Sequence, residues 1–577
     1  MIIVVFDIWC NQKSLIALSV RGAAGDETMH DLKILLFYDI INLLAGMAEL
    51  VDAQDLKSCV GQPTCQFDSG SRHAGLPQGR PFFWTLRQAQ GPHDKEFAMT
   101  FHTYSSECPF KSIEDIKDKK ITIMGLGLNG GGEAAARFFL NKGAFVTVTD
   151  MKTAEQLAPT LERLNNDESL DHSRLTYHLG GHDLADFETA DCVIKNPGVK
   201  YEGNKYLAAA KAIETDLSIF LRFTDCPIIA VTGSKGKSST VSAIYYGLQQ
   251  AGFTAFLGGN ITVSPLTFFD QVSSDTPVVI EFSSWQLADL RGRGVLKPHI
   301  AVITKIVPDH QNWYGNMEDY VADKRLIYAD QDSGNYSIFD AGEDEPGTGP
   351  ECGGTWGDLF ARESHATVIR YNTKTQYSVD FDSLLVPGEH MKLNAQNAAT
   401  VLQLMGVPKQ RAKEILQTWP GIAHRLQYFH SWNNYRFYND SAATVPEAAA
   451  AATQAFGKPV ILLTGGTDKG LSLEKLAQVI CKNAGAPEGT IPPADIYLLA
   501  GTATDKLLPE LDKTNTAYKG PFDSLEQMLE TLKADCKGTL PQDFIPVVFS
   551  PGATSFGMFN NEFDRGEKFM KAVERIF

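Results

Sequence analysis

A glycine-rich loop between an apolar run and a helix-forming run sets the strongest constraint on how this chain folds. The loop lies in residues Val231–Thr240, which read VTGSKGKSST. The apolar run Cys226–Ala230 before it is typical of a buried strand, and Val241–Leu248 after it is typical of a helix. A strand that leads through a tight turn into a helix is the repeating unit of parallel α/β sheets. We therefore predict that this part of the chain forms such a sheet.

The residues of this loop suit the binding of phosphate groups. Gly233 and Gly236 permit a tight turn in which backbone N–H groups point at anionic oxygens. Lys237 adds a positive charge, and the hydroxyl of Ser238 is a ligand that Mg²⁺ accepts. The spacing is shorter than the standard pattern G-x-x-x-x-G-K-[ST], so an ordinary turn with a surface lysine is the alternative interpretation. The flanking strand and helix favour a site for ATP or GTP.

Length, charge and cysteine usage narrow the class of protein. The 577 residues exceed what one core accommodates and predict three or four domains. A net charge of −17 argues against a nucleic-acid binder, and no apolar run is long enough to span a bilayer. The nine cysteines include no C-x-x-C pair, which favours reduced thiols over a disulfide framework. We expect a cytoplasmic, monomeric enzyme with no nucleic-acid or membrane partner.

The first hundred residues differ from the rest of the chain. No helix or strand period is sustained from about Cys59 to Glu96. The segment Met47–Cys59 resembles the peptide obtained when a tRNA gene is translated in error, and Met99 is a plausible start. We therefore expect residues 1–98 to be a spurious or disordered N-terminal extension. The alternative is a species-specific disordered or targeting extension, and mass spectrometry of the native protein would separate the two.

A regular α/β pattern begins near Lys119. The strand Ile121–Met124, the glycine turn Gly125–Gly130, the helix Glu133–Asn141 and the strand Phe145–Asp150 form a predicted βαβ unit. The turn matches G-x-G-x-x-G, and an acid ends the second strand. This pattern is common among NAD- and FAD-binding proteins. It fits equally well any ligand that carries a ribose and a pyrophosphate.

Two further α/β units follow in the sequence, and we expect a surface loop at 342–357. The first unit has one more predicted strand, Cys192–Lys195. The strands predicted in the later units are Val278–Phe282, His299–Lys305, Pro459–Thr464, Asp495–Ala500 and Ile545–Ser550. The fold class is therefore α/β, with three consecutive α/β domains. We expect a Rossmann-like domain at 99–224, a central phosphate-loop domain with a mostly parallel sheet at 225–418, and a Rossmann-like C-terminal domain at 419–577.

Groups that suit a divalent cation follow the predicted strands of the central unit. Glu281 ends one strand, and Asp309 and His310 follow the next. Open α/β sheets bind ligands at this edge, and Mg²⁺ prefers carboxylates together with substrate phosphates. Other residues carry no such signal when taken alone. The sequence around Lys324 is typical of a solvated helix lysine, and the sequences around Arg425 and Asp440 are typical of loops.

The order of the motifs is more informative than any one of them. After TGSKGKSS come GGN, EFSSWQL, PDH, DKRLIY, the pair Asn394 and Asn397, HR, YNDS and GGTDKG. This order resembles that of the Mur ligase family, from about Lys119 to the C-terminus. Within the family, the N-terminal βαβ unit and the ending SPGATSFGMF are most similar to the member that adds D-glutamate.

The resemblance implies a ligase of peptidoglycan precursor synthesis. ATP would phosphorylate the carboxylate of UDP-N-acetylmuramoyl-L-alanine, and the amine of D-glutamate would then displace phosphate from the acyl phosphate. Two Mg²⁺ ions would stabilise the charge that develops on the transferred phosphoryl group. The resemblance also implies that Lys324 is carbamylated by CO₂, which converts an amine into an oxygen-rich metal ligand.

The resemblance assigns roles to individual residues. It implies catalytic roles for Lys237, Lys324 and His310, and metal contacts for Ser238, Glu281, His310 and carbamylated Lys324. ATP would be bound by Gly233, Ser234, Lys235, Gly236, Lys237, Ser238, Ser239, Asn394, Arg425 and Asp440. The UDP substrate would be bound by Gly127, Leu128, Asn129, Gly130, Asp150 and Asn260, and D-glutamate by Thr444, Lys469, Ser555 and Phe563.

Several positions depart from the family pattern. Lys235 and Lys305 stand where the family usually has asparagine, and Ala442 stands where a lysine often lies. The segment around Phe563 is shifted against the usual order of residues. The alternatives are therefore another Mur-type or folylpolyglutamate-synthase-like amide ligase, and a catalytically inactive nucleotide-binding relative. A plain NAD oxidoreductase is favoured only by the first glycine turn.

Overall fold

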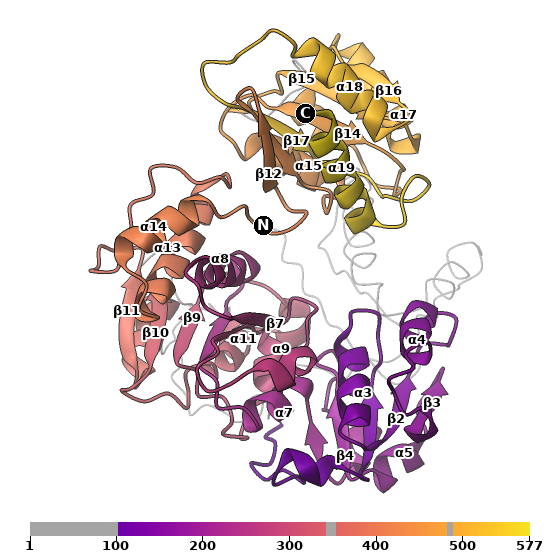
Figure 1. The fold of residues 1–577 in the computed structure, drawn as a ribbon, viewed down its shortest axis with the longest axis vertical. Coiled ribbons are helices and arrows are strands. Elements are labelled where there is room, and N and C mark those ends of the chain that lie inside the picture. Colours follow the sequence, from indigo (N-terminus) through magenta and orange to yellow (C-terminus); the bar gives the residue numbers. More distant parts are fainter. Residues whose placement is uncertain (1–101, 342–353, 482–488) are drawn as a thin grey trace, which may run out of the picture. The chain divides into compact units, whose positions relative to one another are not determined.

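The computed structural model describes residues 102–341, 354–481 and 489–577 (Figure 1). The expectation for residues 1–98 lies outside these ranges, as does most of the loop expected at 342–357. The end of that loop was predicted wrongly, because Trp356 and Gly357 are buried in the first turn of helix α12 (Trp356–Glu363). Among the described residues, no helix combines the length and the apolarity needed to cross a bilayer.

The first module is a five-stranded parallel sheet in the order β3-β2-β1-β4-β5. Its strands are β1 (Lys120–Met124), β2 (Phe145–Asp150), β3 (Leu175–Leu179), β4 (Cys192–Lys195) and β5 (Ile213–Glu214). Its helices are η2 (Ile113–Ile116), α3 (Gly131–Asn141), α4 (Ala158–Asn165), η3 (His172–Arg174), α5 (Leu184–Thr189), α6 (Lys205–Ala209) and α7 (Asp216–Arg222). The strand order reverses between β1 and β4, where such sheets bind ligands.

The second module is a six-stranded sheet in the order β11-β10-β9-β6-β8-β7, and every pair in it is parallel. The strands are β6 (Ile228–Thr232), β7 (Phe256–Gly259), β8 (Val278–Glu281), β9 (Ile300–Ile303), β10 (Tyr336–Asp340) and β11 (Thr367–Tyr371). Besides α12, the helices are α8 (Lys237–Gln250), η4 (Pro265–Gln271), α9 (Ser284–Ala288), α10 (Gln311–Tyr314), α11 (Met317–Arg325), α13 (Glu389–Leu404) and α14 (Lys409–Gln417). The predicted parallel sheet around the glycine loop is confirmed.

Helix α8 packs closely on α13. A Cβ atom at Gly247 would approach Leu402 Cδ1 to 2.5 Å, so any larger residue here would require the leucine side chain to move. The contact places Asn394, on α13, beside the glycine loop that precedes α8. Packing between two helices thus brings a residue distant in sequence to the predicted phosphate site.

The third module is a six-stranded sheet in the order β12-β13-β17-β14-β15-β16. Its strands are β12 (Gln427–Trp432), β13 (Tyr435–Asn439), β14 (Ile461–Gly465), β15 (Asp495–Leu499), β16 (Lys519–Phe522) and β17 (Ile545–Phe549). Its helices are α15 (Pro446–Gln454), α16 (Glu474–Ile480), α17 (Thr502–Lys513), α18 (Leu525–Asp535) and α19 (Glu562–Ile576). Only β12 and β13 pair antiparallel, through a turn in which Asn433 and Asn434 both have positive φ.

One apolar cluster joins the first and second modules. It includes Ile121 and Val146 of the first sheet together with Ala230 and Ile280 of the second. Separate clusters cover the other face of the second sheet and the two faces of the third. The first two modules therefore share part of their apolar core.

Candidate functional site

The glycine loop connects β6 to α8 and leaves no room for side chains at two positions. Gly233 has φ 141° and Gly236 has φ 92°, a region that L-residues rarely adopt. A Cβ at Gly233 would lie 2.0 Å from Thr304 Oγ1, and one at Gly236 would lie 2.6 Å from Asn394 Oδ1. Gly236 is also the N-cap of α8, so free N–H groups of the first helical turn face the loop. This geometry suits an anion such as a phosphate.

The side chain of Lys237 is held over the same loop. Its Nζ donates hydrogen bonds to the carbonyl oxygens of Gly233, at 3.0 Å, and Ser234, at 3.1 Å. Burial lowers the pKa of the Lys237 ammonium, and the nearby carboxylates of Glu281 and Asp309 oppose that shift. The lysine therefore places a positive charge directly at the phosphate loop.

Lys324 is buried, whereas its helical context alone suggested a solvated lysine. Only 1% of its surface is exposed, because α11 packs on α9 and turns this side chain toward the phosphate loop. Its Nζ donates to the Gly233 carbonyl at 3.0 Å and lies 4.6 Å from the centre of the Tyr320 ring. Burial, followed by repulsion from Lys237, lowers the pKa of Lys324 well below 10.5. A neutral amine is thereby favoured at this position.

Glu281 supplies a carboxylate oxygen that lacks a protein partner. The side chain is 1% exposed, and its Oε1 accepts a hydrogen bond from Asn260 Nδ2 at 3.0 Å. Its Oε2 is buried and accepts no hydrogen bond from any described residue. Leaving a buried carboxylate oxygen unsatisfied is costly, and a divalent cation would remove that cost. The donor set therefore fits a magnesium ion.

A further predicted metal contact, His310, lies at the start of α10. Its φ is 52°, and its imidazole packs against the Trp285 ring at a centroid distance of 5.0 Å. Within the described ranges, no three His, Cys, Asp or Glu side chains gather into a metal cage. A Mg²⁺ ion held by one or two protein groups plus phosphates and water needs no such cage.

The departures Lys235 and Ala442 occupy different parts of the chain. Lys235 is largely exposed and forms an ion pair with Asp309, with Nζ and Oδ2 3.2 Å apart. This pair links the phosphate loop to the segment before His310. Ala442 lies in the third module, where its N–H donates to the His424 carbonyl at 3.0 Å. The two positions are therefore held by separate sets of contacts.

The predicted UDP-substrate residues lie on the first module and on one loop of the second. Gly127 N–H donates to Asp150 Oδ2 at 3.0 Å, which ties the glycine turn after β1 to the end of β2. The neighbouring Leu128 is half exposed. A Cβ at Gly130 would lie 3.4 Å from the carbonyl of Thr262, two residues after Asn260. The structure thus brings loops of both modules together at this point.

The residues predicted near adenine and ribose divide between two modules. Asn394 lies on α13, where its Oδ1 accepts a hydrogen bond from Thr240 at 3.4 Å. Asp440 follows β13 in the third module. Its oxygens accept from the Leu426 N–H at 3.0 Å and from Ser550 Oγ at 2.6 Å. Burial raises the pKa of Asp440 to about 6, and the nearby Arg425 opposes this shift.

The residues predicted to bind D-glutamate follow strands of the third sheet or begin its last helix. An isolated bridge between Thr467 and Thr554 places the segments of Lys469 and Ser555 side by side. Lys469 is exposed and Ser555 is buried. Phe563 is 53% exposed in the first turn of α19, and its ring lies 5.4 Å from that of His424. Thr444 lies just before α15 and is partly buried.

Arg565 is a structural residue at this site that the sequence did not identify. It is 1% exposed and donates to Ser441 Oγ at 3.0 Å, to the Ser441 carbonyl at 2.8 Å and to the Ala553 carbonyl at 3.0 Å. It therefore fixes the two loops that carry Ala442 and Ser555. Arg565 lies in the first turn of a polar helix, so the sequence gave no indication that its side chain is buried.

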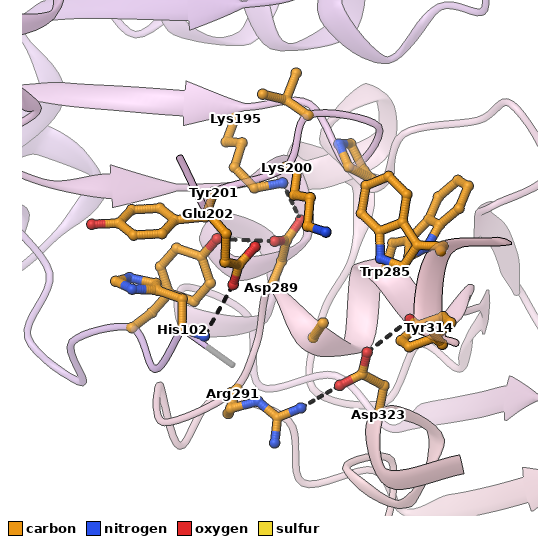
Figure 2. A pocket seen from close by; sticks show the side chains of 15 residues that line it. His102, Lys195, Lys200, Tyr201, Glu202, Trp285, Asp289, Arg291, Tyr314 and Asp323 are labelled. Carbon is orange, nitrogen blue, oxygen red and sulfur yellow. Dashed lines mark hydrogen bonds and ion pairs between the residues drawn. The ribbon is translucent and has the colours of Figure 1, made fainter. Parts of the chain in front are cut away.

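A cavity of about 310 Å³ lies between the segment after β4 and helices α9 to α11 (Figure 2). On one side it is lined by Trp285, and on the other by His102, Tyr201 and Glu202. Buried Lys195 and Asp289, which also line it, form an ion pair of 2.8 Å. None of these side chains was predicted to be functional. Trp285 lies inside the EFSSWQL motif, which was the available signal.

The fold and site define an α/β protein of three modules, with a glycine loop on the central sheet whose geometry suits a phosphate. The chain belongs to the Mur ligase family. The model of the Mur ligase MurD-like N-terminal domain matches residues 119–217, and that of the Mur ligase middle domain matches residues 231–402.

Curated relatives match over most of the chain. The UDP-N-acetylmuramoylalanine--D-glutamate ligase of Treponema pallidum (strain Nichols) is 38% identical, over 80% of this chain and 98% of that protein. The protein of the same name from Roseiflexus sp. (strain RS-1) is 33% identical, over 79% and 98%. Among solved structures, UDP-N-acetylmuramate-alanine ligase MurC from Thermotoga maritima matches with a TM-score of 0.44 and 18% identity, over 79% of this chain and 99% of that one.

Proposed function

We propose that this protein is the ATP-dependent ligase that joins D-glutamate to UDP-N-acetylmuramoyl-L-alanine through an acyl phosphate, in the synthesis of peptidoglycan precursors. One observation carries the proposal for the site. Lys237 and Lys324 both donate to the carbonyl of Gly233, at 3.0 Å each, so two lysines converge on one phosphate loop. The relatives named above carry this activity in their names.

In the first step the loop holds the triphosphate of ATP. The N–H groups around Gly236 and at the start of α8 bind phosphate oxygens, and Lys237 balances their charge as the γ-phosphoryl group moves. The carboxylate of the UDP substrate attacks phosphorus, so that an acyl phosphate forms and ADP leaves. The protein supplies position and charge, and forms no covalent bond to the phosphoryl group.

Mur ligases use ATP and Mg²⁺, and the described residues offer places for the cation. Glu281 Oε2, the hydroxyl of Ser238 and the His310 imidazole would hold Mg²⁺. When bound, the ion stabilises negative charge on the phosphoryl oxygens.

We also propose that Lys324 is carbamylated. Its lowered pKa favours the neutral amine, which adds CO₂ to form a carbamate and releases one proton. The resulting oxygens would serve a second cation. The Lys237 ammonium repels a positive charge on Lys324 and would attract the negative charge of a carbamate there. The electrostatics of the site therefore favour the modification.

The two other substrates would occupy the first and third modules. The glycine turn tied to Asp150 would bind the pyrophosphate and uridine. Asn260 would bind another part of the same UDP substrate, and its hydrogen bond to Glu281 also orients that carboxylate. Lys469, Ser555, Thr444 and Phe563 would surround D-glutamate. The amine of D-glutamate attacks the acyl phosphate, phosphate leaves, and an amide remains.

The proposed domains are residues 99–224, 225–418 and 419–577. We also propose that the enzyme acts in the cytoplasm as a monomer.

One incubation tests the proposal. Purified protein is mixed with ATP, Mg²⁺ and UDP-N-acetylmuramoyl-L-alanine, and phosphate release is measured before and after D-glutamate is added. We expect release only after the addition. Release with L-glutamate and a folate would instead identify a folylpolyglutamate-synthase-like ligase. The absence of any ATP turnover would identify a nucleotide-binding relative without catalysis.

A further inference from the structure

Four aromatic side chains form a continuous row from the cavity of Figure 2 to the phosphate loop. The row consists of Trp313, Trp285, His310 and Tyr320, and successive ring centroids are 4.9, 5.0 and 6.1 Å apart. At its inner end, the Tyr320 hydroxyl donates to Ser234 Oγ, in the phosphate loop, at 2.9 Å. Distances of this size are those of direct aromatic contacts.

The outer end of this aromatic row is contacted by the first module. Lys200, in the segment after β4, has its Nζ 4.9 Å from the centre of the Trp313 ring. The same segment reaches the glycine turn after β1, because the Asn196 N–H donates to the Met124 carbonyl at 3.2 Å. A Cβ at Gly125 would lie only 3.1 Å from that of Asn196. The segment therefore contacts both the proposed UDP-substrate turn and the aromatic row.

His310 is the third residue of this row. Its φ of 52° is in the left-handed region, and its backbone N–H donates to Asp309 Oδ1 at 3.0 Å. No described residue forms a hydrogen bond with the imidazole nitrogens. His310 is exposed, and its imidazole contacts the rings of Trp285 and Tyr320.

Trp285 is itself held by packing. Its indole Nε1 is buried and has no hydrogen-bond partner among the described residues. Its ring lies between Trp313 and His310. A displacement of Trp313 would thus be passed to His310 without breaking any hydrogen bond.

We propose that Trp285 and Trp313 are positioning residues that orient His310 and couple it to the segment of the first module that carries Lys200. This deepens the proposed function and rests on the metal-side role given there to His310. Binding of the UDP conjugate at the first module would then order the imidazole before phosphoryl transfer begins. The cation of Lys200 over Trp313 provides the contact between the first module and this row.

The test compares Trp285→Leu and Trp285→Phe with the wild type. We expect Trp285→Leu to lower kcat at least tenfold and to raise the Mg²⁺ concentration for half-maximal activity at least fivefold. The KM for D-glutamate should change less than twofold, because that substrate binds to the third module. Trp285→Phe keeps an aromatic ring and should recover most of the lost activity. Trp432→Leu, in the third module, is the matched control and should behave as the wild type.

A second measurement tests, without catalysis, whether substrate binding at the first module affects the aromatic row. Tryptophan fluorescence is recorded while UDP-N-acetylmuramoyl-L-alanine is added to the protein without ATP or Mg²⁺. We expect a change in the wild type that falls by at least half in Trp313→Phe and in Lys200→Gln. An unchanged response in both variants would overturn the coupling.

The outcomes separate this inference from the function on which it rests. A wild type that does not turn over refutes the proposed function. If the wild type is active and Trp285→Leu has the same kcat and the same Mg²⁺ dependence, the positioning role is refuted and the proposed function stands. Circular dichroism checks that each variant is folded, and Trp285→Met replaces Trp285→Leu if the latter does not fold.

Discussion

Replacing Gly236 by alanine gives a measurable test of the phosphate loop, because Gly252 provides a matched control. Gly236 and Gly252 flank the same helix, α8, and have nearly the same φ, 92° and 95°. A Cβ at Gly236 would lie 2.6 Å from Asn394 Oδ1, whereas one at Gly252 would meet nothing within 4 Å. The two variants thus share the backbone strain and differ in the close approach.

The expected magnitudes follow from this geometry. An L-residue in the left-handed region costs about 1–2 kcal/mol, so both variants should lose that much unfolding free energy. Gly236→Ala should lose about 1 kcal/mol more, because Asn394 must move away from Thr240. The displaced Asn394 and the altered loop should also weaken ATP binding at least tenfold, which is about 1.4 kcal/mol.

Urea denaturation measures the first effect, and titration calorimetry with ATP measures the second. We expect Gly252→Ala to bind ATP as the wild type does. If Gly236→Ala and Gly252→Ala bind ATP within twofold of each other, the glycine loop does not hold the nucleotide.

Three further predictions concern charged groups. Lys237→Ala should abolish phosphate release, because it removes the positive charge held over the loop; near-normal rates would contradict its role. Lys324→Ala should be inactive and should regain activity with an excess of a short carboxylic acid that supplies the missing oxygens; full activity without the acid would argue against a carbamate. The pKa of Asp440 is raised from 3.8 to about 6, so its protonated form stabilises the fold below pH 3.8, and this contribution is lost as the pH rises through 6. The unfolding free energy of Asp440→Asn relative to the wild type should therefore increase by about 2 kcal/mol between pH 4 and pH 7, and a constant difference in urea denaturation would refute the shift.

The strands that the sequence predicted are the central, apolar ones. The run Val278–Phe282 is β-branched and buried on both faces, so its composition alone predicts a strand. Strand β3 alternates between intermediate and exposed residues, and β16 contains a proline, so neither has an apolar signal of that kind. The sequence therefore predicted the interior of each sheet better than its edges.

Site residues were predictable where a local motif carried them. The phosphate loop was recognisable because its glycines, lysine and serine are consecutive in the chain. The burial of Lys324 was not, because it results from contacts with Thr232, Gly233 and Tyr320, which lie elsewhere in the sequence. The same reason hid the contact between Trp313 and Lys200, which lie on different modules.

The way in which Lys237 is held has a consequence for how this loop can evolve. Its ammonium is anchored by two main-chain carbonyls, and every residue supplies such a group whatever its side chain. A substitution at position 235 can therefore occur without loosening that anchor. An unusual residue such as Lys235 is compatible with the loop for this reason, and divergence among relatives at this position need not signal loss of nucleotide binding.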